Sequence, residues 1–319
     1  MTHETPAVVT AGRSAARILA LALIAAAVAS CRSAPPAASF PPDYPAYIGL
    51  EPGATAYILV DARLARPILD RLDLMGMGSG DRQMARVLDG TDSAAIAFFG
   101  GEAAGEGSLR LIADGNFPSA RARLAMRLGR GWRGMRSPET GGRFWHSGDG
   151  AISVAVAGRE ARVATSSDGT PADPFRSGGG TRVPEGFGAF GSGAAVSLWL
   201  EEAGERLNRM LSGMGLPLFI PAEQLFASLR HAPVPVGWDG APLFAMSISI
   251  QVASPLLANN LAIALSIARG LLAVSDGGGA NPMAALLANP PSADGRYLVL
   301  SGAPMTADEI ALLLGQFLP

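Results

Sequence analysis

The sequence predicts an α+β protein of two tandem similar modules, each an antiparallel sheet with helices packed on one face. Three observations support this fold class. Strand-like runs alternate with segments of helical periodicity. Two long stretches of chain repeat the same order of these elements. A segment rich in Gly, Pro and Ser, residues 166–193, separates the two stretches and is typical of a linker. The expected modules are therefore residues 47–165 and 194–319.

Each module is expected to begin with a strand that runs into a helix. Ala54–Val60 (ATAYILV) and Ala194–Leu200 (AAVSLWL) have the β-branched and aromatic content of strands. Helical spacing of apolar residues follows in both places. Each predicted helix then meets Gly-Met-Gly, at residues 76–78 and 213–215. Glycine after the last periodic apolar residue is a helix stop signal.

The next elements are expected in the same order in both modules. We predict a short helix, then two strands, in each. The expected helices are Asp81–Leu88 and Ala222–Leu229, the first strands Ala94–Phe99 and Val234–Trp238, and the second strands Ser108–Ala113 and Phe244–Ile250. The last of these alternates serine or glutamine with Met or Ile, as a half-buried strand does.

A proline then opens a helix in each module, at Pro118 and Pro255. The interval from Gly-Met-Gly to proline is conserved between the modules, because 213 − 76 and 255 − 118 both equal 137. At the same offset we expect Leu124 and Leu128 to correspond to Leu261 and Leu265. Gly142-Arg143-Phe144 resembles Gly295-Arg296-Tyr297, and each should start another strand. Chance agreement between two Ala- and Leu-rich stretches is the alternative to a duplication.

The chain is expected to close with a loop and a helix. Ser275–Asp294, with three successive glycines and the successive prolines Pro290-Pro291, predicts a long loop. Thr306 and Glu309 fit a capping box at the start of the last helix. The element order as a whole resembles ferredoxin-like folds. It is also similar to exported bacterial proteins of unknown function that carry duplicated modules, a resemblance that implies no activity.

The first thirty residues have the three-part form of a secretory signal. Arg13 and Arg17 form a positive region, Ile18–Ala29 is an unbroken apolar run, and small residues follow. The run is too short to span a bilayer, which takes about 20 residues.

Val28-Ala29-Ser30-Cys31 resembles the lipobox of bacterial lipoproteins. The resemblance implies diacylglycerol attached to Cys31, cleavage before it, and acylation of the new amino terminus, with palmitate as the expected acyl chain. Val28 and Ser30 depart from the commoner residues at their positions. The alternative is ordinary signal-peptidase cleavage, which would leave a soluble protein with a stray thiol.

Residues 32–46 (RSAPPAASFPPDYPA) predict a tether between this cysteine and the folded body. Five prolines favour extended polyproline geometry, so the tether could hold the body about 40–45 Å from the membrane. Arg32 follows the cysteine, where Asp would suggest inner-membrane retention in some bacteria. By that analogy, the expected location is the cell envelope, with the outer membrane favoured over the inner.

Composition excludes several classes of protein. Hydrophobic residues make up 49% and charged residues 16%, which excludes a wholly disordered chain. The formal net charge of -2 offers no basic excess for nucleic acid. Cys31 is the only cysteine, so no internal disulfide can form.

No catalytic, cofactor or metal motif survives inspection of its context. Gly186-Phe-Gly188-Ala-Phe-Gly191 has dinucleotide-type spacing, but a strand rather than a helix should follow it. His146 and His231 lack the spacing of zinc ligands. His146, Ser147 and Asp149 superficially resemble a hydrolase triad, yet neighbours at a strand end point to opposite faces. We therefore expect no cofactor and no metal.

Carboxylate pairs have structural interpretations. Asp89 and Asp92 fit a turn. Glu201 and Glu202 stand where a helix should start, as Asp61 does in the first module, and negative charge is favourable there.

Two further surfaces are candidates for contact with a partner. Leu256–Val274 predicts an amphipathic helix that covers a sheet or lines an apolar cavity, rather than a membrane span. A local basic run comprises Arg121, Arg123, Arg127, Arg130, Arg133 and Arg136. A solvated helix face is its simplest interpretation, and contact with anionic headgroups or a cell-wall polymer is the alternative.

The resulting hypothesis is a non-enzymatic, lipid-anchored envelope protein. Its partners would be the membrane, through Cys31, and an envelope protein or cell-wall component. The first alternative is a carrier of a lipid or another apolar ligand. The second is a hydrolase with an unfamiliar site around His146, Asp149 or His231.

Overall fold

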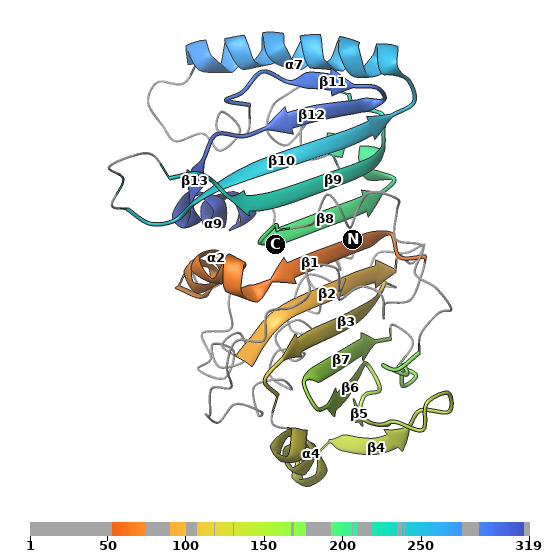
Figure 1. Cartoon of the computed structure of the whole chain (residues 1–319). Helices are drawn as coiled ribbons and strands as arrows, with labels where there is room; N and C mark the ends of the chain where they lie inside the picture. Colours follow the sequence, from red (N-terminus) through yellow and green to blue (C-terminus); the bar gives the residue numbers. More distant parts are fainter. Residues whose placement is uncertain are drawn as a thin grey trace, which may run out of the picture. The chain divides into compact units, whose positions relative to one another are not determined.

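The protein is a mixed α+β structure with antiparallel sheet and few helices, which confirms the coarse fold prediction (Figure 1). The computed structural model describes residues 53–74, 90–99, 107–117, 119–129, 131–166, 169–176, 193–205, 207–208, 219–234, 238, 240–275 and 287–315. The chain divides into two compact units. The first includes Leu69–Val183, and the second includes Thr55–Ile68 and Pro184–Leu318. Their border falls inside the expected linker, but the first strand belongs to the second unit.

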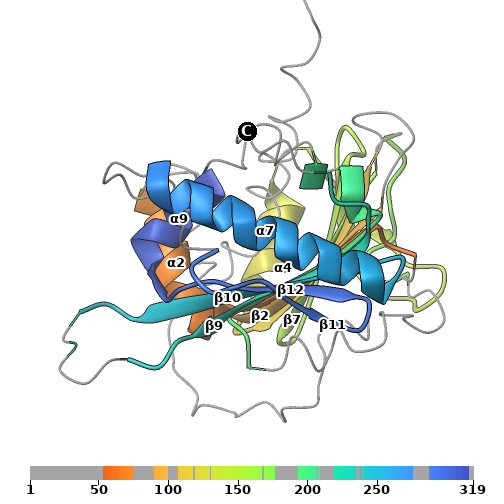
Figure 2. The same cartoon turned by 90° about the horizontal axis from the view of Figure 1, so that it is seen from above.

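The second unit is a sheet with helices on one face. Its strand order is β11 (Ser292–Asp294), β12 (Tyr297–Ser301), β10 (Leu243–Val252), β9 (Ala222–His231), β8 (Val196–Glu201) and β1 (Ala56–Asp61). The short β13 (Met305–Thr306) also pairs with β10. Helix α2 (Ala62–Leu74) follows β1, while α7 (Pro255–Ser275) and α9 (Ala307–Gly315) lie on the same face of the sheet (Figure 2).

Helix α7 packs on the sheet through a continuous apolar core. Leu261 and Leu265 meet Ile250, Leu298 and Leu300 there, and Leu298 is fully buried. Burial of each such side chain contributes about 1.5–3 kcal/mol. The predicted helix over a sheet is therefore confirmed, but its outer face is not uniformly polar, because Leu256, Ile263 and Ile267 are exposed on it.

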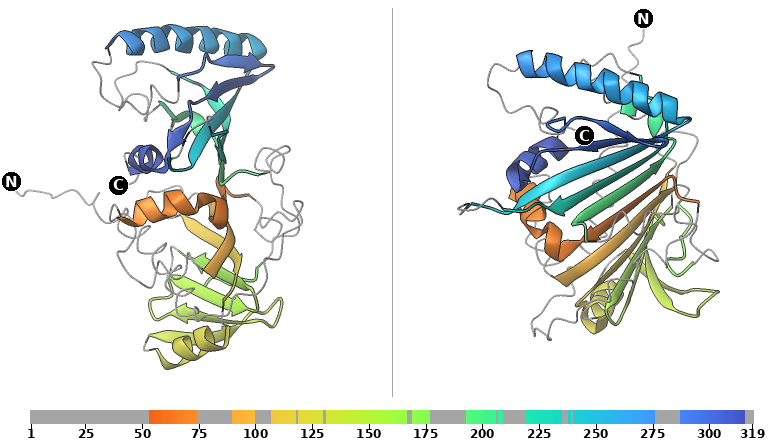
Figure 3. Two further views of the ribbon diagram at one scale, coloured as in Figure 1. Left: turned by 60° about the vertical axis from the view of Figure 1, so that its left-hand side comes forward. Right: turned by 45° about the horizontal axis from the view of Figure 1, so that its top comes forward.

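The first unit is a sheet with the strand order β2 (Thr91–Phe99), β3 (Ser108–Gly115), β7 (Glu160–Thr165), β6 (Ile152–Ala157), β5 (Arg143–Ser147) and β4 (Trp132–Arg136). Helix α4 (Ser119–Leu128) lies beside β4 and β6 (Figure 3). Its buried side is narrow and consists of Ala122 and Met126. Arg123 fastens the helix to the sheet, because its guanidinium donates to the Val156 carbonyl at 3.2 Å.

The two units pair their strands in the same register. In the first, β3 pairs with β7 so that Arg110 lies opposite Ala164 and Asp114 opposite Glu160. In the second, β10 pairs with β12 so that Ser247 lies opposite Ser301 and Gln251 opposite Tyr297. Each of these second-unit positions is 137 residues beyond its first-unit counterpart, the offset that the prolines predict.

A two-residue hairpin turn of the same sequence, Gly-Arg, occurs in both sheets. Gly158-Arg159 joins β6 to β7, and Gly295-Arg296 joins β11 to β12. Both glycines have positive φ, 60° and 55°, which a two-residue hairpin turn requires. The Arg159 carbonyl accepts from Gly115 N at 2.9 Å, and the Arg296 carbonyl accepts from Val252 N at 3.0 Å.

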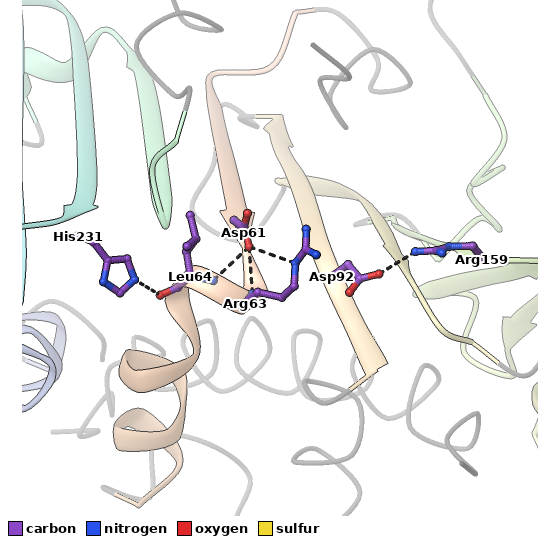
Figure 4. Close-up of polar contacts among 6 residues, drawn as sticks. All are labelled: Asp61, Arg63, Leu64, Asp92, Arg159 and His231. Atoms are coloured by element: carbon purple, nitrogen blue, oxygen red, sulfur yellow. Dashed lines mark hydrogen bonds and ion pairs between the residues drawn. The ribbon is translucent and has the colours of Figure 1, made fainter. Parts of the chain in front are cut away.

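A bulge with an acidic side chain faces each turn arginine. The β2–β3 ladder skips Asp92, and the β9–β10 ladder skips Glu223. Arg159 pairs with Asp92 at 2.7 Å, and Arg296 pairs with Glu223 at 3.2 Å (the first pair in Figure 4). Asp92, which we expected in a turn, is therefore a strand residue with a structural ion pair.

Arg159 also approaches Asp114, with the Nε and Oδ1 atoms 3.7 Å apart. Burial raises the pKa of the Asp114 carboxyl above its ordinary value, against the opposing effect of Arg159. The negative charge of Asp92 raises that pKa further.

Strands β1 and β8 pair symmetrically within the second unit. Asp61 N donates to the Ala195 carbonyl at 3.0 Å, and Glu201 N donates to the Thr55 carbonyl at 2.9 Å. The two bonds are equivalent in sequence spacing, because Glu201 lies 140 residues after Asp61 and Ala195 lies 140 residues after Thr55.

One predicted helix is wrong, because Ala222–Leu229 forms strand β9. Its apolar residues Ala222, Leu225, Phe226 and Leu229 have helical spacing, but β8 and β10 flank the segment and satisfy its backbone on both sides. Tertiary pairing thus overrides the local pattern. Val234 and Trp238, the described residues of the strand expected next, are irregular.

The proposed correspondence of Gly142-Arg143 with Gly295-Arg296 is also wrong. Both pairs do precede strands, but Gly158-Arg159 occupies the position equivalent to Gly295-Arg296. Leu124 and Leu128 do not match Leu261 and Leu265 either, since the first pair is exposed and the second buried.

Two smaller expectations fail. Ser292–Asp294, assigned to the long loop, forms β11. A ferredoxin-like sheet would insert a strand between β8 and β9, whereas these two pair directly. By contrast, the capping box is confirmed, because Glu309 Oε2 accepts from Thr306 N at 2.7 Å and Thr306 Oγ1 accepts from Glu309 N at 3.3 Å. Asp81–Leu88, both Gly-Met-Gly segments and Pro118 lie outside the described residues.

Candidate functional site

The predicted lipidation site is not part of the described structure. Cys31, its leader and the proline-rich tether precede the first described residue, and the Gly186–Gly191 motif also lies outside the described ranges. Among the described residues, no helix is long and apolar enough to cross a membrane. The lipid anchor therefore stays a prediction from sequence.

His146, Ser147 and Asp149 lie at the β5–β6 turn without the geometry of a triad. The His146 ring, 8% exposed, places Nδ1 2.9 Å from its neighbour's carbonyl oxygen rather than from the Ser147 hydroxyl. That hydroxyl donates to Asp149 and accepts from Ile152 N at 3.0 Å. The Ser147 hydrogen bond lowers the pKa of the Asp149 carboxyl, with help from Ala151 N. These contacts close a turn.

His231 and Asp61 fix the start of α2 (Figure 4). Asp61 Oδ1 accepts from Arg63 N at 3.0 Å and from Leu64 N at 3.1 Å, which is the helix-start role expected of it. The His231 Nε2 atom lies 3.0 Å from the Leu64 carbonyl oxygen. Glu201 ends β8, and Glu202, with φ of 49°, precedes the helical residues 203–205, so this pair also stands at a helix start.

Metal ligands do not gather in the part of the chain that the structure describes. No group of three or more His, Cys, Asp or Glu side chains there could hold an ion. The carboxylates nearest one another, Asp92 and Asp114, are occupied by Arg159.

The clearest concave surface of the first unit is a groove between α4 and the β4–β5 hairpin, which we call the α4 groove. Its volume is about 500 Å³. The residues that give it chemical character are Met126, Arg127, Trp132, Arg136, Arg143 and Trp145. Two arginines of the basic run, Arg127 and Arg136, thus meet two of the four tryptophans at one site.

Strand register explains why these side chains share a face. β4 and β5 pair so that Arg136 lies opposite Arg143, and Gly134 lies opposite Trp145. Residues two apart on a strand point to the same side, so Trp132, Arg136, Arg143 and Trp145 all belong to one face of the hairpin. Arg133, opposite His146, belongs to the other face.

Gly134 lies against the Trp145 ring. A Cβ atom at Gly134 would lie 3.7 Å from the Trp145 Nε1 atom, in ordinary contact with the ring. Trp145 is buried, whereas Trp132 is half-buried and Met135 is exposed. The floor of the groove is aromatic and its margin is cationic.

The arginines of the groove form no ion pair within the described part of the chain. Among the described residues, no carboxylate forms an ion pair with Arg127, Arg136 or Arg143. Like charges directly opposite on neighbouring strands destabilise a sheet. The Arg136–Arg143 pair is thus an unfavourable arrangement in the free protein that a bound anion would relieve.

A second groove of about 500 Å³ lies in the second unit, between α7 and β11. Asn259, Ile263, Ser266 and Ile267 line it from the helix, and Pro291 lines it from the chain before β11. We call it the α7 groove. It is neutral, and Leu256, Ile263 and Ile267 form an outward apolar stripe with exposed fractions of 71%, 61% and 62%.

Sequence inspection identified the basic run but not the site. Arg143 and Trp145 follow the run by several residues and join it only through the β4–β5 register. Alternation along the two strands was the available signal, since Trp132, Gly134 and Arg136 lie two apart. Of the other run members, Arg123 binds Val156 instead of lining the groove.

Comparisons with known proteins show the fold only. No family model and no curated protein matches the chain. Crystal structures of TP0453 are similar: form I has 18% identity and a TM-score of 0.54, covering 88% of this chain and 99% of that one. Form III has 16% identity and the same TM-score, covering 84% and 96%. The likeness thus extends over most of both chains, at an identity that supports no inference about activity.

Proposed function

We propose that the protein is a lipid-anchored, non-enzymatic component of the bacterial envelope that binds a ligand in the α4 groove. The observation that carries the binding role is the convergence of Arg127, Arg136 and Arg143 on one aromatic groove without acidic partners among the described residues. A binding role is also favoured over hydrolysis because the polar groups of His146, Ser147 and Asp149 are engaged in a turn.

The anchor rests on the leader and the unique cysteine. The test is metabolic labelling with a fatty-acid analogue, comparing the wild type with Cys31→Ser. We expect label in the wild-type band and none in the variant. Unlabelled wild-type protein would contradict the anchor. Membrane fractionation of the labelled cells tests the further expectation that the outer membrane holds it.

We also propose that the chain contains a tandem duplication, in which β1–β7 and β8–β12 derive from one α+β module. The equal registers, the Gly-Arg hairpin turns and the acidic bulge residues support it. Under this proposal β1 of the first copy joins the sheet of the second unit, so copies and compact units differ.

A turn exchange tests the duplication. Ala157→Asp with Glu160→Tyr converts the first turn to the sequence of the second, Asp-Gly-Arg-Tyr. If the turns are equivalent, the free energy of unfolding should change by less than about 1 kcal/mol, because only exposed or half-buried positions change. A loss of several kcal/mol in a urea titration would contradict equivalence.

The carrier alternative has one observation in its favour, the exposed apolar stripe of Leu256, Ile263 and Ile267 beside the α7 groove. Native mass spectrometry of the purified protein would detect a co-purifying lipid. The space between α7 and the sheet is filled by the Leu261 and Leu265 core, so such a ligand would lie outside the helix.

A further inference from the structure

We infer that the α4 groove binds an acidic saccharide, whose carboxylate or other oxyanion pairs with the arginines while a sugar face lies on Trp132. This inference rests on the proposed binding role and names its ligand class, and the lipid anchor enters only the choice between a glycan and a bilayer. Three features of the groove lead to it: its charge, its rings and its open form.

The charge feature is the cross-strand pair. Arg136 and Arg143 face each other directly, and Arg127 reaches the same groove from α4. Guanidinium groups match oxyanions through paired N–H donors. An oxyanion placed among the three would convert a repulsive arrangement into a set of charge-assisted hydrogen bonds. Among the described residues no carboxylate pairs with these three arginines, so a bound anion would balance their charge.

The ring feature is the aromatic floor. Trp132 is half-buried, so part of its ring faces the groove. Trp145, which is buried, lies on the same face of the hairpin and also lines the groove. A pyranose has an apolar face of C–H groups that fits an aromatic surface, with hydroxyls at its edge for polar neighbours. An acyl chain would bury its methylenes in a closed apolar tunnel and would leave these arginines without a partner.

The surface of an anionic bilayer is the main competing ligand. Leu128 on α4 is 74% exposed and would suit such a surface. The predicted tether, however, is long enough in extended polyproline geometry to place the body about 40–45 Å from the membrane that would anchor it. That distance favours a soluble or polymeric glycan of the envelope, and anionic vesicles are therefore included in the test.

The experiment is calorimetric titration of the purified full-length protein with three probes: oligogalacturonate, neutral maltohexaose and phosphatidylglycerol vesicles. We expect saturable binding of oligogalacturonate, and binding of maltohexaose at least about tenfold weaker, because one charge-assisted contact is worth about a factor of ten. Raising salt from about 0.05 M to about 0.5 M should weaken wild-type binding several-fold, since the groove is open to solvent.

Variants place the ligand in the groove. Arg136→Gln and Arg143→Gln should each weaken oligogalacturonate binding about tenfold. Arg133→Gln is the matched control, with the same charge change on the same strand but on the opposite face, and should change affinity less than about twofold. The melting temperature of Arg136→Gln should equal or exceed that of the wild type, because the like-charge pair is removed.

Each contrary result overturns a defined part. Equal affinity for maltohexaose, or salt-independent binding by the wild type, overturns the acidic ligand. Vesicle binding without oligogalacturonate binding replaces the saccharide with a bilayer while the binding role stands. Equal losses in Arg133→Gln and Arg136→Gln remove the groove as the site. No binding to any probe overturns both the ligand class and the proposed binding role.

Discussion

Helix α4 and helix α7 follow corresponding hairpins, yet the surfaces beside them differ in almost every respect. α4 has 10 residues and carries arginines, whereas α7 has 21 residues and Arg269 as its one charged residue. In the first sheet, β5 and β4 lie beyond β6, the strand beside α4. In the second sheet, β11, the strand beside α7, is the edge strand. The first unit therefore has a basic, aromatic groove where the second has a neutral, apolar one.

The difference at the sheet edges has a local cause. In the first unit Ser153 and Val154 of β6 pair with His146 and Trp145 of β5. At the offset of 137, the second unit has Pro290 and Pro291 at these positions. Proline cannot donate to a ladder, so no further strand can add through these residues. Among the described residues of the second unit, the extra hairpin that forms the α4 groove thus has no counterpart beside α7.

The largest expected effect is on the free energy of unfolding and compares the hydrophobic cores of the two units. Leu298, under α7, is fully buried, and Ala161 is its first-unit counterpart. Leu298→Ala should lower the free energy of unfolding by about 2–5 kcal/mol, through lost burial and a cavity. Ala161→Leu should cost about 1–3 kcal/mol by overpacking. Urea denaturation measures both, and a Leu298→Ala loss below about 1 kcal/mol would contradict the packing role of α7.

The second prediction concerns the proline edge. Pro290→Ser with Pro291→Val restores the residues of the first unit. We expect a loss of about 1–2 kcal/mol, because each proline restricts the unfolded chain. The variant should also associate at high concentration, since the edge regains N–H donors. Sedimentation velocity checks the association, and Ser292→Val is the control that adds β-propensity without removing proline. Equal association of the control would contradict the proline mechanism.

A third, smaller effect compares the two bulge ion pairs. Arg159 and Arg296 are similarly exposed, but Asp92 is 31% exposed against 47% for Glu223, and Arg159 also approaches Asp114. Asp92→Asn should cost up to about 1 kcal/mol, and Glu223→Gln only a few tenths, as expected of exposed pairs. Equal losses would mean that the two turns are held in the same way. NMR titration of Asp114 provides a separate test. Asp92→Asn should lower the pKa of Asp114, because a neighbouring negative charge is lost.

Some features of this structure depend on residues that are close in sequence, whereas others depend on how the strands pair. The sequence could predict only the first kind. The Asp61 helix start, the Thr306–Glu309 capping box and the proline-initiated α7 depend on neighbours in sequence, and all are confirmed. The turn equivalent to Gly295-Arg296 depends on register. Gly142-Arg143 and Gly158-Arg159 have the same residues, and only the pairing of β7 with β3 distinguishes them.

The failure at Ala222–Leu229 has the same origin. Its apolar spacing fits a helix, and the strand forms because β8 and β10 lie on either side. The candidate site was missed for this reason too. Arg136 and Arg143 become neighbours only when β4 pairs with β5, which spacing along one segment cannot indicate.

The smallest expected effect concerns the β5–β6 turn of the first unit, for which the described residues of the second unit show no equivalent. The Ser147 hydroxyl lowers the pKa of the Asp149 carboxyl by donating a hydrogen bond to it. Ser147→Ala should therefore raise the Asp149 pKa toward its ordinary value, while Ala151 N retains part of the shift. Because a carboxyl with a depressed pKa stabilises the fold above its unfolded pKa and loses that contribution as pH falls through its folded pKa, wild type and variant should differ near neutral pH and converge in acid. NMR titration gives the pKa, and Ser93→Ala, a hydroxyl deletion on β2, is the control. An unchanged Asp149 pKa in Ser147→Ala would mean that the backbone donors alone lower this pKa. The Ser147 side chain would then have no part in holding the β5–β6 turn.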